Sequence, residues 1–217
     1  MEWSQELINR FLKTDPATYG HYLGVSFMNH KIKPLNKKLK MIGTAYTVKL
    51  LGKDSCMLYR ALEEAPKRSV IVIDHSGDEV FASVGEMVAR NAKALGLAGI
   101  VTDGMATDSL WLGEMDFPVF SSGVSVITTN VWGVSGQYNI SVSCGGAPVN
   151  PGDIVFGDAD GLVVMNPDNY EEYLVKAETA AEREVEMRKR FENGEAMLKS
   201  VKGLMSADIP KIISENR

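Results

Sequence analysis

The chain has 217 residues, 45% of them hydrophobic, and a formal net charge of −5. These values are typical of one globular domain with a proper core, and no composition break or Gly/Ser linker divides residues 1–217. A mildly acidic chain does not favour nucleic acid as a partner. Cys56 and Cys144 are too few for a disulfide framework or a cysteine metal site. Because the chain opens without a signal-peptide pattern and lacks a long apolar run, we expect a cytoplasmic protein with no membrane partner.

The first part of the chain alternates predicted helices and strands. A helix is expected over residues 4–13, Asp15-Pro16 stops it or makes a turn, and an irregular stretch follows to about Lys40. The next expected elements are a strand over 40–51, a helix over 56–65 and a buried strand over 70–74, which ends at the polar run from His75 to Asp78.

The second part becomes richer in strands. Helical spacing of Met87, Val88, Ala92, Leu95 and Leu97 predicts a central helix, and residues 98–101 read as a short buried strand. Further predicted elements are a short helix near 110–115, a strand at 119–121, several strands within 124–165, and a charged helix from Pro167 to about Asn193 with Gly194 as its stop. Alternating helices and strands followed by a strand-rich half predict a layered α/β domain.

The stretch from Gly85 to Asp108 offers two polar clusters joined by one helix and one strand. Gly85-Glu86 stands where a loop becomes the central helix, and Asp103-Gly104 to Asp108 follows the end of the buried strand. Folding is therefore expected to bring Glu86 and Asp108 near one sheet edge. Free N–H groups and a partial positive charge at the start of a helix are suited to hold a substrate carboxylate, with a cation on Asp108 beside it.

Three segments carry a resemblance to a known family: VGEMVARNAKALGLAGIVTDGMATD, FPVFSSGVS and SVSCGGAPVNPGDIVFGDADGLVVM. They resemble the RraA-like family, which includes the regulator of ribonuclease E activity A and the 4-hydroxy-4-methyl-2-oxoglutarate/4-carboxy-4-hydroxy-2-oxoadipate aldolases. Demethylmenaquinone methyltransferase, an older name for such proteins, is not supported by the resemblance. The likeness runs from about Asp15 to Gly194. It implies an α/β sandwich of the swivelling β/β/α type, with the C-terminal helix at a subunit interface of a trimer or a dimer of trimers.

The resemblance also implies a site. In the aldolases a Gly-Asp/Glu step starts a helix whose next two amides hold the carboxylate of pyruvate, and here those positions are Gly85-Glu86 followed by Met87 and Val88. Glu86 would orient a metal-bound water. The aldolase pattern Asp-Gly-x-x-Arg-Asp then supplies an arginine for the enolate and an aspartate for the cation. Here it reads Asp103-Gly104-Met105-Ala106-Thr107-Asp108, so the metal ligand Asp108 is present and Thr107 replaces the arginine.

A carboxylate from a neighbouring subunit completes the water shell of the metal in the aldolases, and spacing indicates Glu184 for this role, with Glu182 second. Asp108 with waters is hard-oxygen chemistry, which suits Mg²⁺ or Mn²⁺. His75 and Arg90 are the candidates to replace the missing arginine. The candidate catalytic residues are Glu86, Asp103, Thr107 and Glu184, and the candidate substrate-binding residues are Gly85, Glu86, Met87, Val88, Thr107 and His75.

Each of these residues also has a purely structural interpretation. Asp103-Gly104 is a common turn dipeptide, and Asp108 is placed to cap the following helix. Glu184 fits a solvated helix face, and a single histidine such as His75 is more often structural than catalytic. Cys144 fits a small buried residue.

Three functional hypotheses remain. The first is a divalent-metal-dependent lyase that acts on a 2-oxoacid or related oxo-carboxylate by retro-aldol cleavage or decarboxylation. The second is a protein-binding regulator, as the resemblance to the ribonuclease regulator implies. The third is a metal enzyme of the same scaffold whose substrate needs no arginine. Glu86 and Asp108 favour an enzyme, and Thr107 favours the third hypothesis over a strict pyruvate aldolase.

Overall fold

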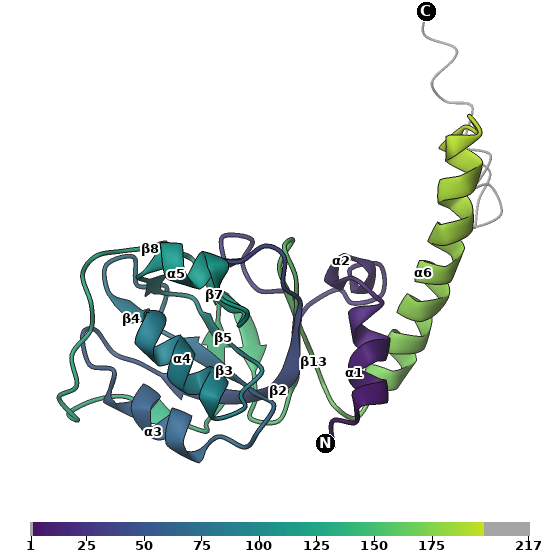
Figure 1. Cartoon of the computed structure of the whole chain (residues 1–217). Coiled ribbons are helices and arrows are strands. Elements are labelled where there is room, and N and C mark those ends of the chain that lie inside the picture. The colour runs from purple at the N-terminus through teal and green to yellow at the C-terminus, as the bar shows by residue number, and fades with distance from the viewer. Residues whose placement is uncertain (1, 198–217) are drawn as a thin grey trace, which may run out of the picture.

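The computed structural model describes residues 2–197 and forms an α/β fold around one twisted, mostly parallel sheet. Four strands run parallel at its centre, and antiparallel strands flank them (Figure 1). The order across the sheet is β1 (Lys33–Pro34), β7 (Val119–Ser121), β5 (Gly99–Thr102), β3 (Ser69–Asp74), β2 (Met41–Lys49), β12 (Ile154–Gly157) and β13 (Leu162–Met165), and β9 (Gln137–Tyr138) pairs with β2.

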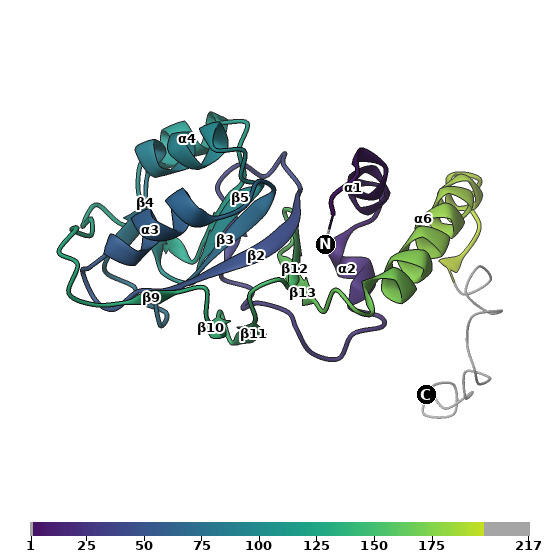
Figure 2. The same cartoon turned by 90° about the horizontal axis from the view of Figure 1, so that it is seen from below.

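Helices α3 (Cys56–Glu64) and α4 (Glu86–Ala94) cover one face of this sheet, as Figure 2 shows. They connect consecutive parallel strands, and α5 (Ser109–Glu114) precedes β7 in the same way. Parallel strands covered on both faces carry continuous apolar runs, and β3 is buried at every position, with residues 70–73 apolar between Ser69 and Asp74. The core on this side contains Leu58 and Leu62 of α3, Ala89 and Ala92 of α4, and Ile71 and Ile73 of β3.

A small hairpin covers the opposite face of the sheet. Its strands are β10 (Val142–Cys144) and β11 (Ala147–Val149), and they turn through Gly145 and Gly146, both with positive φ. Cys144 is fully buried here beside Val72 and Val101, as expected for a small structural residue. The layers are thus hairpin, sheet and helices, which is the β/β/α sandwich that the resemblance implied and agrees with the layered α/β domain predicted from the elements.

A second, smaller ribbon lies above the carboxyl end of the main sheet. It consists of the parallel strands β4 (Ala82–Val84), β6 (Met105–Ala106) and β8 (Gly123–Val124). Strands β4 and β6 and the pairing of β8 were not predicted from the sequence, because strands of two or three residues show no periodicity. This ribbon places the candidate site.

The N-terminal helices pack against the last hairpin of the main sheet. The predicted first helix is α1 (Gln5–Leu12), which Ser4 caps and which ends before Asp15-Pro16 as predicted; Pro16 then begins a short helix, α2 (Pro16–Tyr19). Proline suits the first turn of a helix, where its missing N–H would have no partner. The aromatic rings of Phe11, Tyr19 and Phe156 make edge contacts at the centre of this third core.

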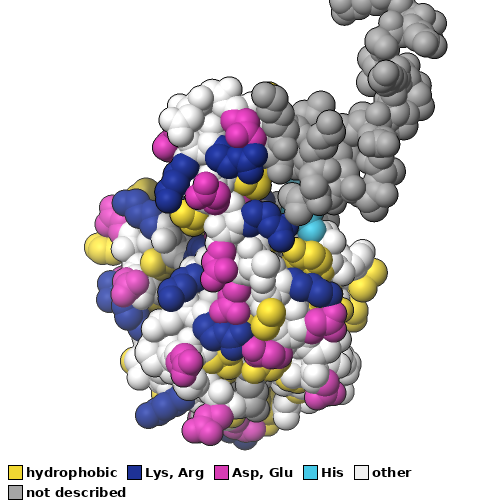
Figure 3. All heavy atoms as spheres, turned by 90° about the vertical axis from the view of Figure 1, so that its right-hand side faces the viewer, with side chains coloured by type: hydrophobic (Ala, Val, Ile, Leu, Met, Phe, Trp, Pro, Cys, Tyr) yellow, Lys and Arg dark blue, Asp and Glu magenta, His cyan; other side chains and the backbone are white. Residues whose placement is uncertain are grey.

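The C-terminal helix α6 (Tyr170–Glu192) leans on α1 and α2 and then extends past the rest of the molecule (Figure 1). It begins three residues later than the sequence predicted, and Gly194 follows it with a positive φ, as expected for a helix stop. Basic and acidic side chains are mixed over this side of the molecule (Figure 3). Among residues 2–197, no helix combines the length and apolarity needed to cross a bilayer.

Candidate functional site

Two neighbouring strand ends bring the two halves of the predicted site together. Val84 of β4 pairs with Ala106 of β6, so Gly85 and Thr107 leave the ribbon side by side. The N–H of Thr107 donates to the carbonyl of Val84 over 2.8 Å. The N–H of Glu86 donates to Oδ2 of Asp108 over 2.9 Å. Folding therefore places the start of α4 directly against Asp108, as the sequence indicated.

The carboxylate of Asp108 does not cap the helix that follows it. Asp108 precedes α5 with φ 54° and ψ 38°, and its side chain makes no capping hydrogen bond. Instead it turns back to the first amide of α4. Its other oxygen, Oδ1, lies 3.4 Å from the hydroxyl of Thr107, and the residue is exposed. Asp108 thus keeps free lone pairs that face solvent.

The start of α4 leaves two amides open beside this carboxylate. The first hydrogen bond within the helix runs from the N–H of Ala89 to the carbonyl of Gly85. The N–H groups of Met87 and Val88 therefore lack an acceptor inside the helix. Together with the helix dipole, they are suited to bind an anionic oxygen pair.

The side chain of Glu86 turns along its own helix. Its Oε1 accepts from Nε of Arg90 over 2.7 Å, and only 18% of the Glu86 side chain is exposed. Arg90, a candidate for the missing arginine, lies one turn further along α4 and is held by Glu86. The pair places one cation and one further carboxylate close to Asp108.

His75 and Asp103 lie in a different cluster. The ring Nε2 of His75 is 2.7 Å from the carbonyl of Gly52, and its backbone N–H donates to Oδ1 of Asp103 over 2.6 Å. Burial raises the pKa of Asp103, while backbone N–H donors from His75 and Gly145 partly oppose that rise. Because these bonds are directed to the interior, the structural interpretation describes His75 better than a role beside Thr107.

Glu184 is not near Asp108 within one chain. It lies on α6 and pairs with Arg188 over 2.9 Å. In Figure 1, α6 stands at the far right, beyond β13 at one end of the sheet, whereas α4 and α5 lie towards the left. Glu184 of one copy could therefore meet Asp108 only from a second copy.

The chemistry of these donors fits a hydrated divalent cation. Within residues 2–197, no group of three or more His, Cys, Asp or Glu side chains could hold a metal by itself. Mg²⁺ commonly keeps several waters and takes only one or two carboxylates. Asp108, with Glu86 nearby, matches that requirement.

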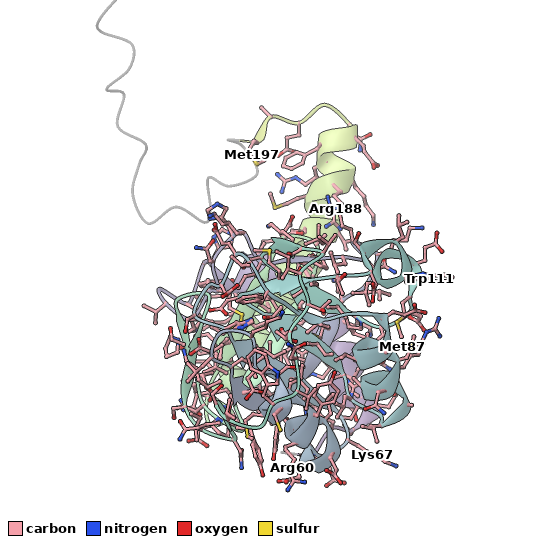
Figure 4. All side chains as sticks on the ribbon, turned by 90° about the vertical axis from the view of Figure 1, so that its left-hand side faces the viewer. Arg60, Lys67, Met87, Trp111, Arg188 and Met197 are labelled. Carbon is pink, nitrogen blue, oxygen red and sulfur yellow. The ribbon has the colours of Figure 1, made fainter. Side chains whose placement is uncertain are left out.

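Apolar side chains surround the site and face outward. The exposed fraction is 65% for Met87, 85% for Leu110 and 58% for Trp111. Met87 and Trp111 lie on the same side of the molecule in Figure 4. Met87 was expected on the buried face of α4, but Ala89 and Ala92 occupy that face. Exposed apolar clusters of this kind mark interaction surfaces.

The loop after β8 runs beside the ribbon and is fixed by one carboxylate, that of Asp54. Asp54 is 1% exposed and accepts five backbone N–H groups. Burial by itself raises the pKa of Asp54, but these donors outweigh it and hold the pKa well below its usual range. The donors belong to Cys56, Trp132, Gly133, Val134 and Ser135. Sequence reasoning missed this role because it depends on contacts about eighty residues apart.

Known proteins similar to this chain include both enzymes and regulators by name. Residues 16–164 match the RraA-like family model, described as Aldolase/RraA. A relative from Halalkalibacterium halodurans, named as a candidate 4-hydroxy-4-methyl-2-oxoglutarate aldolase, is 38% identical over 154 residues, which is 71% of this chain and 73% of the relative. An uncharacterised protein from Methanocaldococcus jannaschii is 31% identical over 76% of this chain and 79% of its own length.

Solved structures share the fold. The structure of Streptomyces coelicolor RraAS2, described as an unusual member of the RNase ES inhibitor RraA family, superposes with a TM-score of 0.74 at 28% identity, over 87% of this chain and all of that one. An uncharacterised protein from Pseudomonas syringae pv. tomato gives a TM-score of 0.80 at 22% identity, over 94% and 96% of the two chains.

Proposed function

Because this chain belongs to the RraA-like family, we propose that it is a divalent-metal-dependent lyase that cleaves or decarboxylates a 2-oxoacid. The observation that carries the proposal is the contact between the start of α4 and Asp108. It sets a carboxylate-binding helix terminus beside a hard-oxygen ligand. Such a pairing suits a substrate that presents a carboxylate and a neighbouring oxo group, as 2-oxoacids do.

The residues of the chain have separate tasks in this reaction. The amides of Met87 and Val88 bind the substrate carboxylate and orient it. Asp108 would hold Mg²⁺ or Mn²⁺, which when bound supplies Lewis-acid stabilisation of negative charge on the 2-oxo oxygen. Glu86 would hold a water molecule and move a proton through it.

Both reactions break one carbon–carbon bond and leave the same enolate. In decarboxylation of oxaloacetate, the bond to the departing carboxylate breaks and CO₂ leaves. In retro-aldol cleavage, the 4-hydroxyl loses its proton and the bond between carbons 3 and 4 breaks, which releases an oxo product. In each case carbon 3 of the enolate then takes a proton from water and gives the 2-oxoacid product, pyruvate in the simplest case.

The proposed site is completed between copies of the chain. The exposed apolar side chains Met87, Leu110 and Trp111 favour a homo-oligomeric contact beside Asp108. Glu184 of the adjoining copy would then hold a water of the metal. We propose a trimer or a pair of trimers, because a head-to-tail ring gives every copy the same shared site.

Thr107 supports a second candidate function. A threonine at the arginine position offers a hydroxyl but no charge, so the pocket would suit a substrate with less negative charge than the aldolase substrates. The same substitution fits a regulator that binds a protein partner through its exposed apolar surface. Turnover of oxaloacetate separates these functions from the lyase.

The test measures decarboxylation of oxaloacetate with Mg²⁺ or Mn²⁺ and with a chelator. We expect metal-dependent turnover, and Asp108→Asn should lower it by roughly 100-fold or more. Each metal should also raise the melting temperature of the wild-type protein, but not of Asp108→Asn, because a ligand of the native state stabilises it. Asp116→Asn, at an exposed aspartate after α5, is the matched control and should behave as wild type. Turnover that resists the chelator would refute the metal-dependent reaction.

A further inference from the structure

Four parallel strands end in a single row of polar residues. Lys49 of β2 pairs with Asp74 of β3, and the next register position places Asp103, just after β5, beside Asp74. Continuing the register of β5 with β7 places Ser122 beside Asp103. We call Lys49, Asp74, Asp103 and Ser122 the carboxyl-edge row. Ligands of open α/β sheets bind outside the carboxyl ends of their strands.

The carboxyl-edge row forms the floor of a cavity of about 450 Å³. Its walls include Ser76 in the loop after β3, Ser143 of β10 and Gly145 at the turn of the hairpin. Asp74 is 5% exposed and Asp103 is 7% exposed, so both carboxylates lie deep. Neither Glu86 nor Asp108 lines this cavity.

Hydrogen bonds hold the polar groups of the row in place but do not use all of their donors and acceptors. The ammonium of Lys49 has three protons and directs two of them, to Oδ1 of Asp74 over 2.7 Å and to the hydroxyl of Ser76 over 2.8 Å. Asp103 accepts backbone N–H groups from His75, Gly145 and Gly77. Within the described residues, one ammonium proton of Lys49 and one lone pair of the Asp103 carboxylate therefore remain for a ligand.

Charge limits the class of ligand. Lys49 pairs with Asp74, and Lys31 pairs with Glu79 in the same lining, so both pairs are neutral, while Asp103 adds negative charge whenever it is ionised. The cavity therefore disfavours an anion such as the 2-oxoacid of the proposed reaction. Along the row the ammonium of Lys49 is followed by the two neighbouring carboxylates of Asp74 and Asp103 and then by the hydroxyl of Ser122. Neighbouring hydroxyl groups suit this order, because each can donate to one of the two carboxylates and one of them can also accept from the ammonium.

We propose that the carboxyl-edge row binds a neutral polyhydroxylated small molecule through a vicinal diol. One hydroxyl donates to Asp74 and accepts from Lys49, and its neighbour donates to Asp103. The cavity volume is within the range of small-molecule sites. Its few convergent polar groups supply the specificity.

Saturation-transfer NMR on the full chain tests the proposal with matched probes. We expect erythritol, ribose and myo-inositol to bind with a dissociation constant on the order of 1 mM, since few contacts are made. 1,4-Butanediol, which has the chain of erythritol without adjacent hydroxyls, should give no signal. Addition of Mg²⁺ or phosphate should leave the erythritol signal unchanged.

Three variants test whether the polyols bind in this cavity. Ser143 is exposed at the wall, so Ser143→Tyr should fill the cavity, abolish the erythritol signal and keep the fold and the oxaloacetate turnover. Asp103→Asn should weaken binding at least about tenfold, because one acceptor becomes a donor. Arg60→Ala, on the exposed face of α3, is the control and should bind as wild type. Equal signals from erythritol and butanediol, no signal from any polyol, or full binding by Ser143→Tyr would each overturn the proposal.

Discussion

A Cβ atom at position 85 would lie 2.6 Å from Oδ2 of Asp108, closer than such atoms come in folded proteins. The same atom would lie 2.8 Å from Cγ2 of Thr107. The backbone of Gly85 is extended, with φ −133° and ψ −172°, so any residue could adopt it. Glycine is needed here for space, because it lets the Asp108 carboxylate reach the start of α4.

Gly85→Ala should displace Asp108 without unfolding the chain. The added methyl group pushes the carboxylate off the amide of Glu86, so we expect metal affinity and oxaloacetate turnover to fall at least about tenfold. Stability should fall by about 1–3 kcal/mol, the usual effect of overpacking. Calorimetric metal titration and thermal unfolding measure the two effects. Gly113→Ala, in α5 with only ordinary contacts around it, should change neither; equal losses in both variants would contradict the close-approach explanation.

Thr107→Arg should distinguish a weakened lyase from an enzyme of another substrate. If the pocket is built around pyruvate, a guanidinium at position 107 stabilises the enolate and should raise kcat/KM for oxaloacetate at least about tenfold. Ser109→Arg adds the same charge two residues further on and serves as the control. A gain in Ser109→Arg alone, or in neither variant, would mean that the arginine position has another use in this chain.

Mixing two inactive variants should restore activity if Asp108 and Glu184 come from different copies. Glu184→Gln and Asp108→Asn are each expected to lose most turnover. In a randomly mixed ring, about one quarter of the sites combine an intact Asp108 with an intact Glu184. Rates after mixed refolding should therefore approach about one quarter of the wild-type rate. No recovery on mixing would refute the shared site, and recovery with Glu182→Gln instead would assign the role to Glu182.

Protonation of Asp54 at low pH should destabilise the loop beside the site. Since its pKa is lower in the folded chain than in the unfolded one, the stability that its ionised form contributes is present above the ordinary carboxyl pKa of about 4 and is lost as pH falls below it. At pH 7 the melting temperature of Asp54→Asn should therefore lie well below that of the wild type, and this gap between the two melting temperatures should narrow towards pH 3. Asp116→Asn should show no such gap. A gap that stays constant with pH would contradict this assignment.

The sequence predicted the elements that have strong periodicity. It did not predict the short strands whose pairing depends on where other strands end. The buried strands β2, β3, β5 and β7 and the helices between them were found within a few residues, because apolar runs and helix-start signals mark them. Strands β4 and β6 carry no such signal, yet their pairing is what joins Gly85 to Thr107.

Among the site residues, too, the sequence predicted only the contacts that follow from the order of helices and strands. The link between Glu86 and Asp108 could be inferred, since both follow from the order of helix and strand. The position of Asp103 could not, because its neighbours Lys49, Asp74 and Ser122 are set by register across four strands and not by spacing along the chain. Glu86 and Arg90 have the spacing of four residues that is common for salt bridges on a helix. Only the structure shows that Glu86 holds Arg90, which was a candidate to replace the missing arginine.

Helix α6 packs on the rest of the described chain through its first half. Its buried residues are Leu174 and Ala177, and its ion pairs with Arg10 end at Glu178, so among the described residues no side chain of α6 beyond Ala177 is buried. Isolated helices of this length are marginal in water. If Glu184 serves a neighbouring copy, docking there orders the turns beyond Ala177 and completes the site in one event. Dilution below the assembly constant would then loosen the helix and silence the enzyme together, so specific activity would rise with protein concentration.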